Sequence, residues 1–193
     1  MSACEALDSL DSPGPPGYTA AMNNDAGTVF LCYSSTRLEA LASWIDECLV
    51  RLTSDQIWRR GEAQNSVGNL VVHLCGNVHE RITLALGRGG PSTRDRDAEF
   101  DISLRRTSEE LRQQLNGTIS EAAVVLRQFP AERLTEQTPK PGYDRLVLEN
   151  IFTVLEHFAV HTGQIMFATK QMTQRDLGEM TRSGKPKPVE SSS

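Results

Sequence analysis

Hydrophobic residues recur at three- and four-residue steps along four stretches of the chain, and this spacing is typical of one face of an α-helix. In the first stretch the apolar stripe consists of Leu38, Leu41, Ile45, Leu49 and Leu52. In the third it consists of Leu111, Leu115, Ile119, Ala122 and Leu126. The predicted helices cover about residues 28–52, 66–86, 107–129 and 145–172. No stretch has the period-2 alternation of a strand.

Local signals support the limits of these helices. Asn65 or Ser66 can cap the second helix, and Thr107 with Glu110 has the spacing of a capping box for the third. Asp144 is predicted to be the N-cap of the fourth. Residues 55–58 could form a short turn between the first two helices. Four long helices with one apolar core predict an all-α protein, a four-helix bundle.

The composition of both ends differs from that of the bundle. Residues 1–27 are rich in Ser, Pro, Gly, Asp and Ala, which predicts a disordered N-terminal tail. Met22 is a candidate for the true first residue. Residues 176–193 predict a flexible C-terminal tail. The bundle is therefore expected over residues 28–175.

Charge and cysteine content narrow the class of protein. The 193-residue chain has a net charge of −5 and a pI of about 5.4. No basic patch stands out, which argues against nucleic acid and anionic membranes as partners. There is no secretory signal pattern and no run of 18 apolar residues. The four cysteines lack CxxC spacing and are interpreted as reduced, buried thiols of a cytoplasmic protein.

Two of the predicted helices carry polar stripes within otherwise apolar sequence. Residues 66–79 contain no Asp, Glu, Lys or Arg, yet Asn69, His73 and Asn77 share one face, which Glu80 extends. On the fourth helix one face carries Asn150, Thr153, His157, His161 and Gln164. Buried polar groups need partners, since an unpaired one costs about 1–3 kcal/mol. We therefore expect the two stripes to face each other and to line one polar cavity.

In that cavity three histidines would meet. His157 and His161 lie one helical turn apart on one face, and His73 would approach from the second helix. Imidazole ligands suit Zn²⁺, Ni²⁺, Cu²⁺ or Fe²⁺, and three of them leave a coordination position open. The alternative is that these histidines are only hydrogen-bonded in the interior. His79 and Cys75 point away from this face and are left out.

Other polar, small and aromatic residues have simpler explanations. Gly76 and Gly163 are interpreted as sites of close helix packing, and Trp44 and Trp58 as packing groups. The charged run at residues 94–99 is interpreted as a solvated loop.

Three segments also resemble a known family. NSVGNLVVHLCGN (residues 65–77), RDRDAEF (94–100) and EHFAVHTGQI (156–165) resemble the DinB-like superfamily of metal-binding four-helix bundles, in one of its uncharacterised branches. The resemblance covers about residues 28–175. It implies long crossover loops, frequent dimers, and a divalent metal, often nickel or zinc, bound at positions matching His73, His157 and His161. Characterised relatives include bacillithiol- or mycothiol-dependent transferases and a maleylpyruvate isomerase.

The expected function is that of a metal-dependent enzyme, a thiol transferase or a hydrolase. Its metal would activate water or a low-molecular-weight thiol for attack on a small electrophile. Asn77 and Gln164 are candidates to orient substrate or water, and Glu80 is the nearest general base. A homodimer in the cytoplasm is expected. The alternative is a non-catalytic metal-binding stress or sensor protein.

Overall fold

The computed structural model describes residues 25–62, 64–90, 92–101, 103, 105–139 and 144–177. Most of the two predicted tails, and Met22, lie outside these residues. The described elements are α1 (Ala26–Arg51), α2 (Ser54–Trp58), α3 (Val67–Val78), the π-helix η2 (His79–Arg88), the 3-10 turn η3 (Ala98–Phe100), α4 (Ser108–Gln128), the 3-10 turn η4 (Ala131–Thr135) and α5 (Val147–Thr173).

The predicted all-α class is confirmed. No β-strand forms within the described residues, where one isolated bridge joins Gln137 to Leu146. None of the described helices combines the length and apolar character that a membrane crossing requires.

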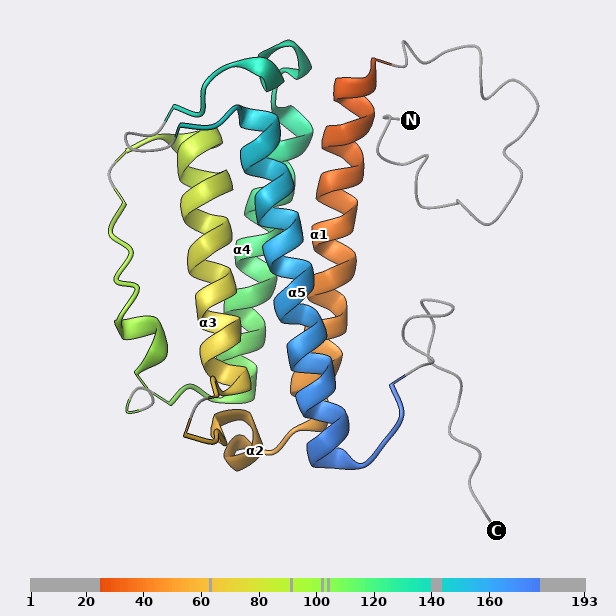
Figure 1. The fold of residues 1–193 in the computed structure, drawn as a ribbon, viewed down its shortest axis with the longest axis vertical. Coiled ribbons are helices and arrows are strands. Elements are labelled where there is room, and N and C mark those ends of the chain that lie inside the picture. Colours follow the sequence, from red (N-terminus) through yellow and green to blue (C-terminus); the bar gives the residue numbers. More distant parts are fainter. Residues whose placement is uncertain are drawn as a thin grey trace, which may run out of the picture.

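The long helices form a bundle with crossover connections (Figure 1). Helix α1 packs mainly on α4 and α5, and α3 packs mainly on the same two helices, so that α1 and α3 lie diagonally opposite. The chain runs down α1, up α3, up α4 and down α5 in the view of Figure 1. Because α3 and α4 are parallel, the segment between them must return along the bundle, and it does so beside α3. This return segment, residues 89–107, is called the crossover loop below.

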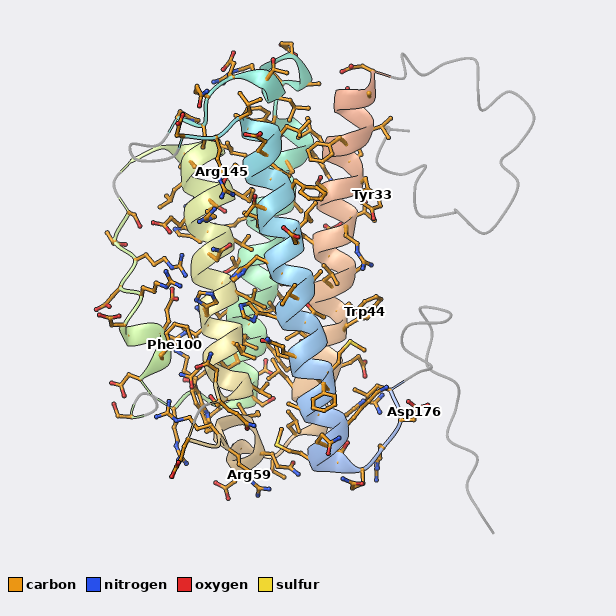
Figure 2. All side chains as sticks on the ribbon, viewed as in Figure 1. Tyr33, Trp44, Arg59, Phe100, Arg145 and Asp176 are labelled. Carbon is orange, nitrogen blue, oxygen red and sulfur yellow. The ribbon has the colours of Figure 1, made fainter. Side chains whose placement is uncertain are left out.

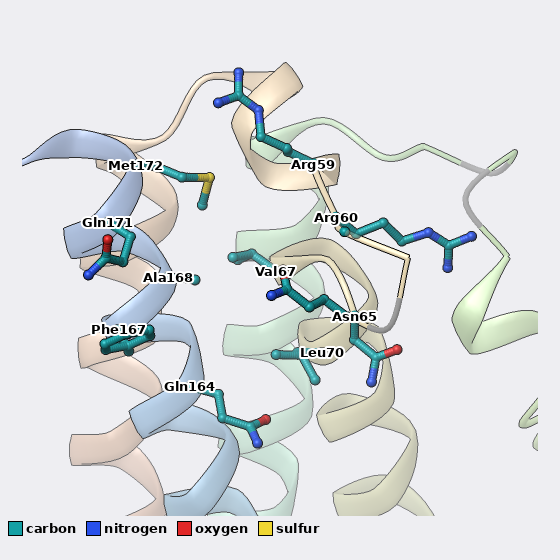
Figure 3. Close-up of a pocket in the computed structure, with 12 residues that line it drawn as sticks. Arg59, Arg60, Asn65, Val67, Leu70, Gln164, Phe167, Ala168, Gln171 and Met172 are labelled. Carbon is teal, nitrogen blue, oxygen red and sulfur yellow. The ribbon is translucent and has the colours of Figure 1, made fainter.

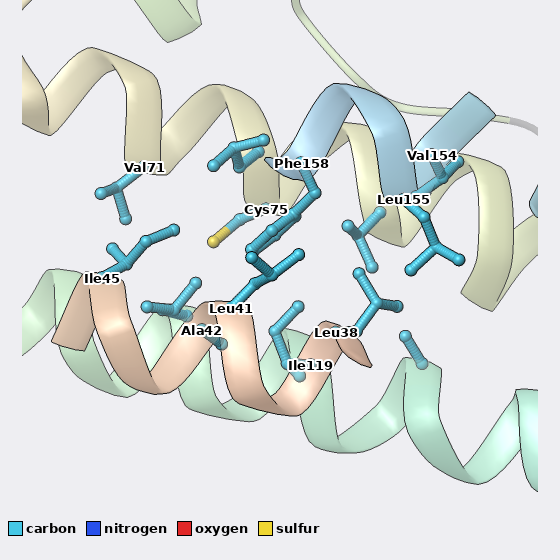
Figure 4. Close-up of a cluster of buried hydrophobic side chains, with 14 of the residues drawn as sticks. Leu38, Leu41, Ala42, Ile45, Val71, Cys75, Ile119, Val154, Leu155 and Phe158 are labelled. Atoms are coloured by element: carbon cyan, nitrogen blue, oxygen red, sulfur yellow. The ribbon is translucent and has the colours of Figure 1, made fainter. Parts of the chain in front are cut away.

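The apolar stripes predicted from the sequence form the core. Every member of the α1 and α4 stripes is buried, and Phe158 of α5 is fully buried among Leu41, Ile45 and Ile119 (Figure 4). Trp58 is also buried, as a packing residue whose Nε1 donates to the carbonyl of Arg106. The predicted packing role of Trp58 therefore agrees with the structure.

The cysteines agree only in part with the prediction of reduced thiols. Cys48 and Cys75 are buried free thiols, whereas Cys32 is disulfide-bonded. Burial raises the pKa of the Cys75 thiol to about 12. Cys75 is therefore a packing residue and not a metal ligand or nucleophile.

One predicted helix start is correct and one is wrong. Thr107 caps α4 as expected, since its hydroxyl accepts from the Glu110 backbone N–H and the Glu110 carboxylate accepts from the Thr107 N–H. Asp144 does not cap α5, which begins three residues later at Val147. The backbone N–H of Thr138 donates to the carbonyl of Arg145, and that of Val147 donates to the carbonyl of Glu136. These bonds hold Leu146 in an extended conformation and delay the helix.

This difference gives a stability prediction. Thr107→Ala is expected to lower the free energy of unfolding by about 0.5–2 kcal/mol, because it removes the α4 cap. Asp144→Ala should leave it within about 0.5 kcal/mol of wild type. Urea denaturation of both variants measures the difference, and equal losses would show that the cap assignment is wrong.

The second predicted helix is continuous, but it changes type. The α-helix ends at Val78 and a π-helix continues to Arg88. The buried amide of Asn150 on α5 donates to the carbonyl of Arg81 at 2.9 Å, within this wider segment. Side chains beyond Val78 therefore do not follow the α-helical angles from which the polar stripe was predicted.

Candidate metal centre

Three imidazole rings meet between α3 and α5. His73 comes from α3, and His157 and His161 come from consecutive turns of α5. One nitrogen of each ring lies within 4.8 Å of the other two, and these three residues form a group that could hold a metal ion. The ring centroids are 4.4–5.4 Å apart. The histidines of the two polar stripes thus meet, as the sequence predicts.

The donor atoms of this group suit a metal ion. Nε2 of His73 lies 2.9 Å from Nε2 of His157. Two nitrogens bound to one zinc ion at about 2.0–2.1 Å would be about 2.9–3.4 Å apart for angles of roughly 90–109°. Without an ion, the same contact can be a hydrogen bond, which requires one of the two nitrogens to carry a proton.

Partners on the outer side fix the tautomer of two rings. Nδ1 of His73 lies 2.9 Å from the Glu99 carboxylate, and Nδ1 of His161 lies 2.7 Å from the side-chain oxygen of Gln164. Both oxygens only accept, so both Nδ1 atoms donate to them. The longer contact of 3.3 Å between Nδ1 of His73 and Nη2 of Arg94, which is also a donor, is therefore not a hydrogen bond. The lone pair of each Nε2 is then available for a metal. Such outer partners are typical of metal-binding histidines.

Glu99 and Arg94 are the site residues that the sequence prediction missed, since the segment containing them was interpreted as a solvated loop. Glu99 is 6% exposed. Arg94 donates to it through Nε at 2.5 Å and Nη2 at 2.9 Å, and to Glu80 through Nη1 at 3.0 Å. Glu80, predicted as a weak general base, is therefore held in an ion pair. The prediction of a solvated loop is wrong for Arg94 and Glu99.

The crossover loop is built to deliver Glu99. The Asp95 carboxylate accepts from the backbone N–H groups of Asp97 and Ala98 at 3.1 Å and so starts the η3 turn. The amide of Asn69 on α3 donates to the Glu99 carbonyl at 3.0 Å. Phe100 follows, on the loop beside α3, with its ring 5.2 Å from that of His73 (Figure 2). The turn is thereby fixed against the helix that carries His73.

The two predicted orienting residues lie on different sides of the centre. Asn77, buried on α3, lines a small cavity of about 150 Å³ together with His73 and His157. Gln164 is exposed on α5 and lines a groove of about 830 Å³ that Arg59, Phe167 and other residues complete (Figure 3). The small cavity therefore adjoins the centre directly, whereas the larger groove borders only Gln164, the hydrogen-bond partner of His161.

The sequence match extends over this whole arrangement. Residues 25–183 match the family described as a protein of unknown function, DUF1572. The chain belongs to the DUF1572 family. Neither a curated protein nor a solved structure matches the chain.

His157 and His73 are held in the neutral form that a metal requires. Burial, together with the neighbouring His161 and His73, lowers the pKa of His157 to about 4. Burial also lowers the pKa of His73, although Glu99 acts in the opposite direction. The hydrogen bond to Glu99 raises the pKa of Arg94.

The metal-free DUF1572 domain is expected to lose stability as the pH falls from about 6.5 towards 4. His157 has a folded pKa of about 4 and an unfolded pKa of about 6.5, so the unfolded state binds more protons between these values. Its stabilising contribution is complete above about pH 6.5 and falls progressively towards pH 4. Thermal denaturation across this range should show a shallower pH dependence in His157→Gln. An unchanged slope would rule out His157 as the titrating group.

Gly76 has a specific reason to be glycine. A Cβ at Gly76 would lie inside van der Waals contact with Oε1 of Glu99 and 3.0 Å from Nε of Arg94. Its predicted role in close packing is correct, although its neighbour is the crossover loop and not another helix. Gly163 is exposed, and a Cβ there would meet nothing within 4 Å. The packing role predicted for Gly163 is wrong.

Gly76→Ala is therefore expected to destabilise the DUF1572 domain by about 1–3 kcal/mol, because it forces Glu99 from its place. Gly117→Ala is a matched control in α4, where a Cβ meets nothing within 4 Å. It should stabilise by about 0.5–1 kcal/mol, as is usual in a helix. Chemical denaturation measures both variants, and stabilisation by both would contradict the contact between Gly76 and Glu99.

Proposed function

We propose that this protein is a DinB-like metalloenzyme. His73, His157 and His161 would hold one divalent ion, Zn²⁺ or Ni²⁺, and the reaction would be attack by water or a low-molecular-weight thiol on a small electrophile. Membership of DUF1572 and the grouping of the three histidines support this proposal. The corresponding activity is that of a thiol transferase or a hydrolase.

The observation that carries the proposal is a neutral donor set beside a cavity. Two of the three rings direct Nδ1 protons outward, to Glu99 and Gln164, and a cavity adjoins His73 and His157. A divalent ion bound by three neutral ligands keeps its full charge, acidifies a bound water or thiol and polarises a carbonyl. An open position next to a cavity is typical of catalytic and not structural metal sites.

The surrounding side chains would position the histidines and the substrates. Glu99 holds the Nδ1 proton of His73, and Gln164 holds that of His161. Both Glu99 and Glu80 are bound by Arg94, which makes either a poor general base. Asn77 is placed to orient a substrate group in the small cavity.

The larger groove suits the thiol substrate. It borders Gln164, the partner of His161, and has room for a molecule of ordinary cofactor size. Arg59 and Arg60 lie at one side of it, and the apolar Phe167 and Met172 lie at another (Figure 3). Cationic and apolar groups together favour a thiol that carries a carboxylate. We further propose that the protein acts in the cytoplasm as a homodimer.

Two measurements test this function. Elemental analysis of the purified protein should find one Zn²⁺ or Ni²⁺ per chain. The metal-loaded protein should then turn over a substrate in a panel of thiols with electrophiles or in a panel of hydrolase substrates, and His157→Ala should not. A loaded protein whose activity equals that of His157→Ala in both panels would favour the non-catalytic stress or sensor protein. A metal-free protein would leave only hydrogen-bonded histidines.

A further inference from the structure

The small cavity beside the histidines is lined by cationic and polar side chains and by no acidic one. Its lining consists of His73, Asn77, Arg81, Arg94, Arg96, Thr153 and His157. Three of these side chains are guanidinium groups, and none is a carboxylate. Glu99 and Glu80 lie behind the wall, where both bind Arg94. The lining of this cavity therefore carries guanidinium groups from Arg81, Arg94 and Arg96 and no carboxylate.

The uncharged members of the lining can also donate hydrogen bonds. Nη1 of Arg145 donates to the Thr153 hydroxyl oxygen at 2.8 Å, which leaves the hydroxyl hydrogen to point elsewhere (Arg145 is labelled in Figure 2). Asn77 is 8% exposed and lines the cavity, and its side-chain amide carries two N–H donors.

We propose that this cavity binds the oxyanion group, a carboxylate or phosphate, of the small substrate that reacts at the three-histidine centre. An oxyanion only accepts hydrogen bonds, so it matches a wall made of donors. Guanidinium groups match its geometry with paired N–H donors. The proposal rests on the metal-dependent function proposed above, because it assigns the substrate of that site.

The volume limits the size of the bound group. A cavity of about 150 Å³ holds several waters, since one water needs only about 10–15 Å³ of such volume. That is room for a phosphate or for a carboxylate with a few carbon atoms. Arg96 is exposed, so it lies where the cavity meets solvent and where an anion enters. The anionic group would then lie beside His73 and His157, with the rest of the substrate at the centre.

Binding to the metal-free protein tests this site without any turnover. Isothermal titration calorimetry or NMR titration with acetate, inorganic phosphate and neutral acetamide should show one saturable site per chain for at least one of the two anions and none for acetamide. Tighter binding of acetate or of phosphate identifies which oxyanion the substrate carries. Arg96→Gln and Arg81→Gln should each weaken the anion about tenfold.

Arg105→Gln is the matched control, since Arg105 is an exposed arginine on the same crossover loop outside the cavity lining. It should bind as the wild type does. No saturable anion binding, or equal weakening by all three substitutions, overturns the proposal. Anion binding in a protein that takes up no metal would contradict the proposed enzyme function but support the anion site. The reverse result, turnover without anion binding, would remove the site alone.

Discussion

Replacing His157 by alanine is expected to weaken the binding of Zn²⁺ or Ni²⁺ by roughly 100- to 1,000-fold. Structural zinc sites contribute about 10–16 kcal/mol, so each of four ligands accounts for about 2.5–4 kcal/mol. His157 lies at the middle of the group, with its Nε2 2.9 Å from that of His73 and its ring 4.4 Å from that of His161. Its loss leaves two rings, of which only His73 is buried.

Competition titration with a chelator of known affinity measures this change. His79→Ala is the matched control, because His79 is the one histidine of the chain outside the group of three. It should bind metal as the wild type does. Circular dichroism shows whether each variant is folded. Folded His157→Ala with wild-type affinity would mean that the ion binds elsewhere.

Glu99→Gln is expected to lower metal affinity by about 10- to 100-fold, the usual effect of removing an outer partner of a metal-binding histidine. Glutamine keeps an oxygen that can accept from Nδ1 of His73, but it lacks the charge that increases the basicity of the ring. The substitution also removes the carboxylate of Glu99, the main acid partner of Arg94. The positive charge of Arg94 would then be paired with Glu80 alone.

Asp97→Asn provides the control for this substitution, since Asp97 is an exposed carboxylate on the same crossover loop. The same chelator competition should find no change for Asp97→Asn. If both variants lowered affinity equally, the effect would be one of net charge, and Glu99 would have no specific role in positioning His73.

The bundle and the three histidines could be predicted because their signals are local. Helical periodicity can be recognised from residues close together in the sequence. Neutral polar stripes on two buried helices need hydrogen-bond partners, and each stripe can provide them for the other. His73 and His157, 84 residues apart, were brought together by that reasoning alone. The requirement that buried polar groups find partners supplied the long-range information.

Glu99 could not be predicted in this way. A run of charged residues in a loop is usually solvated. The sequence of residues 94–99 contains no signal that this run packs along α3. One signal was available in Gly76, which lies one turn beyond His73 on an apolar helix. A glycine there indicates that another segment approaches closely. Which segment approaches depends on the crossover connection, and the sequence of α3 does not contain it.

The predicted start of α5 is wrong for a related reason. Asp144 is a good capping residue by type, but backbone hydrogen bonds of Arg145 and Val147 to residues 138 and 136 keep Leu146 extended. Such tertiary contacts override local capping preference. The change to a π-helix after Val78 is also invisible to a pattern read at α-helical spacing.

A crystal structure of the protein loaded with Zn²⁺ would locate the bound ion directly. We expect one ion per chain, about 2.0–2.1 Å from one nitrogen each of His73, His157 and His161, with a position open towards the small cavity. An ion bound at other residues, or electron density for the three imidazoles joined only by hydrogen bonds at saturating Zn²⁺, would contradict the proposed metal centre.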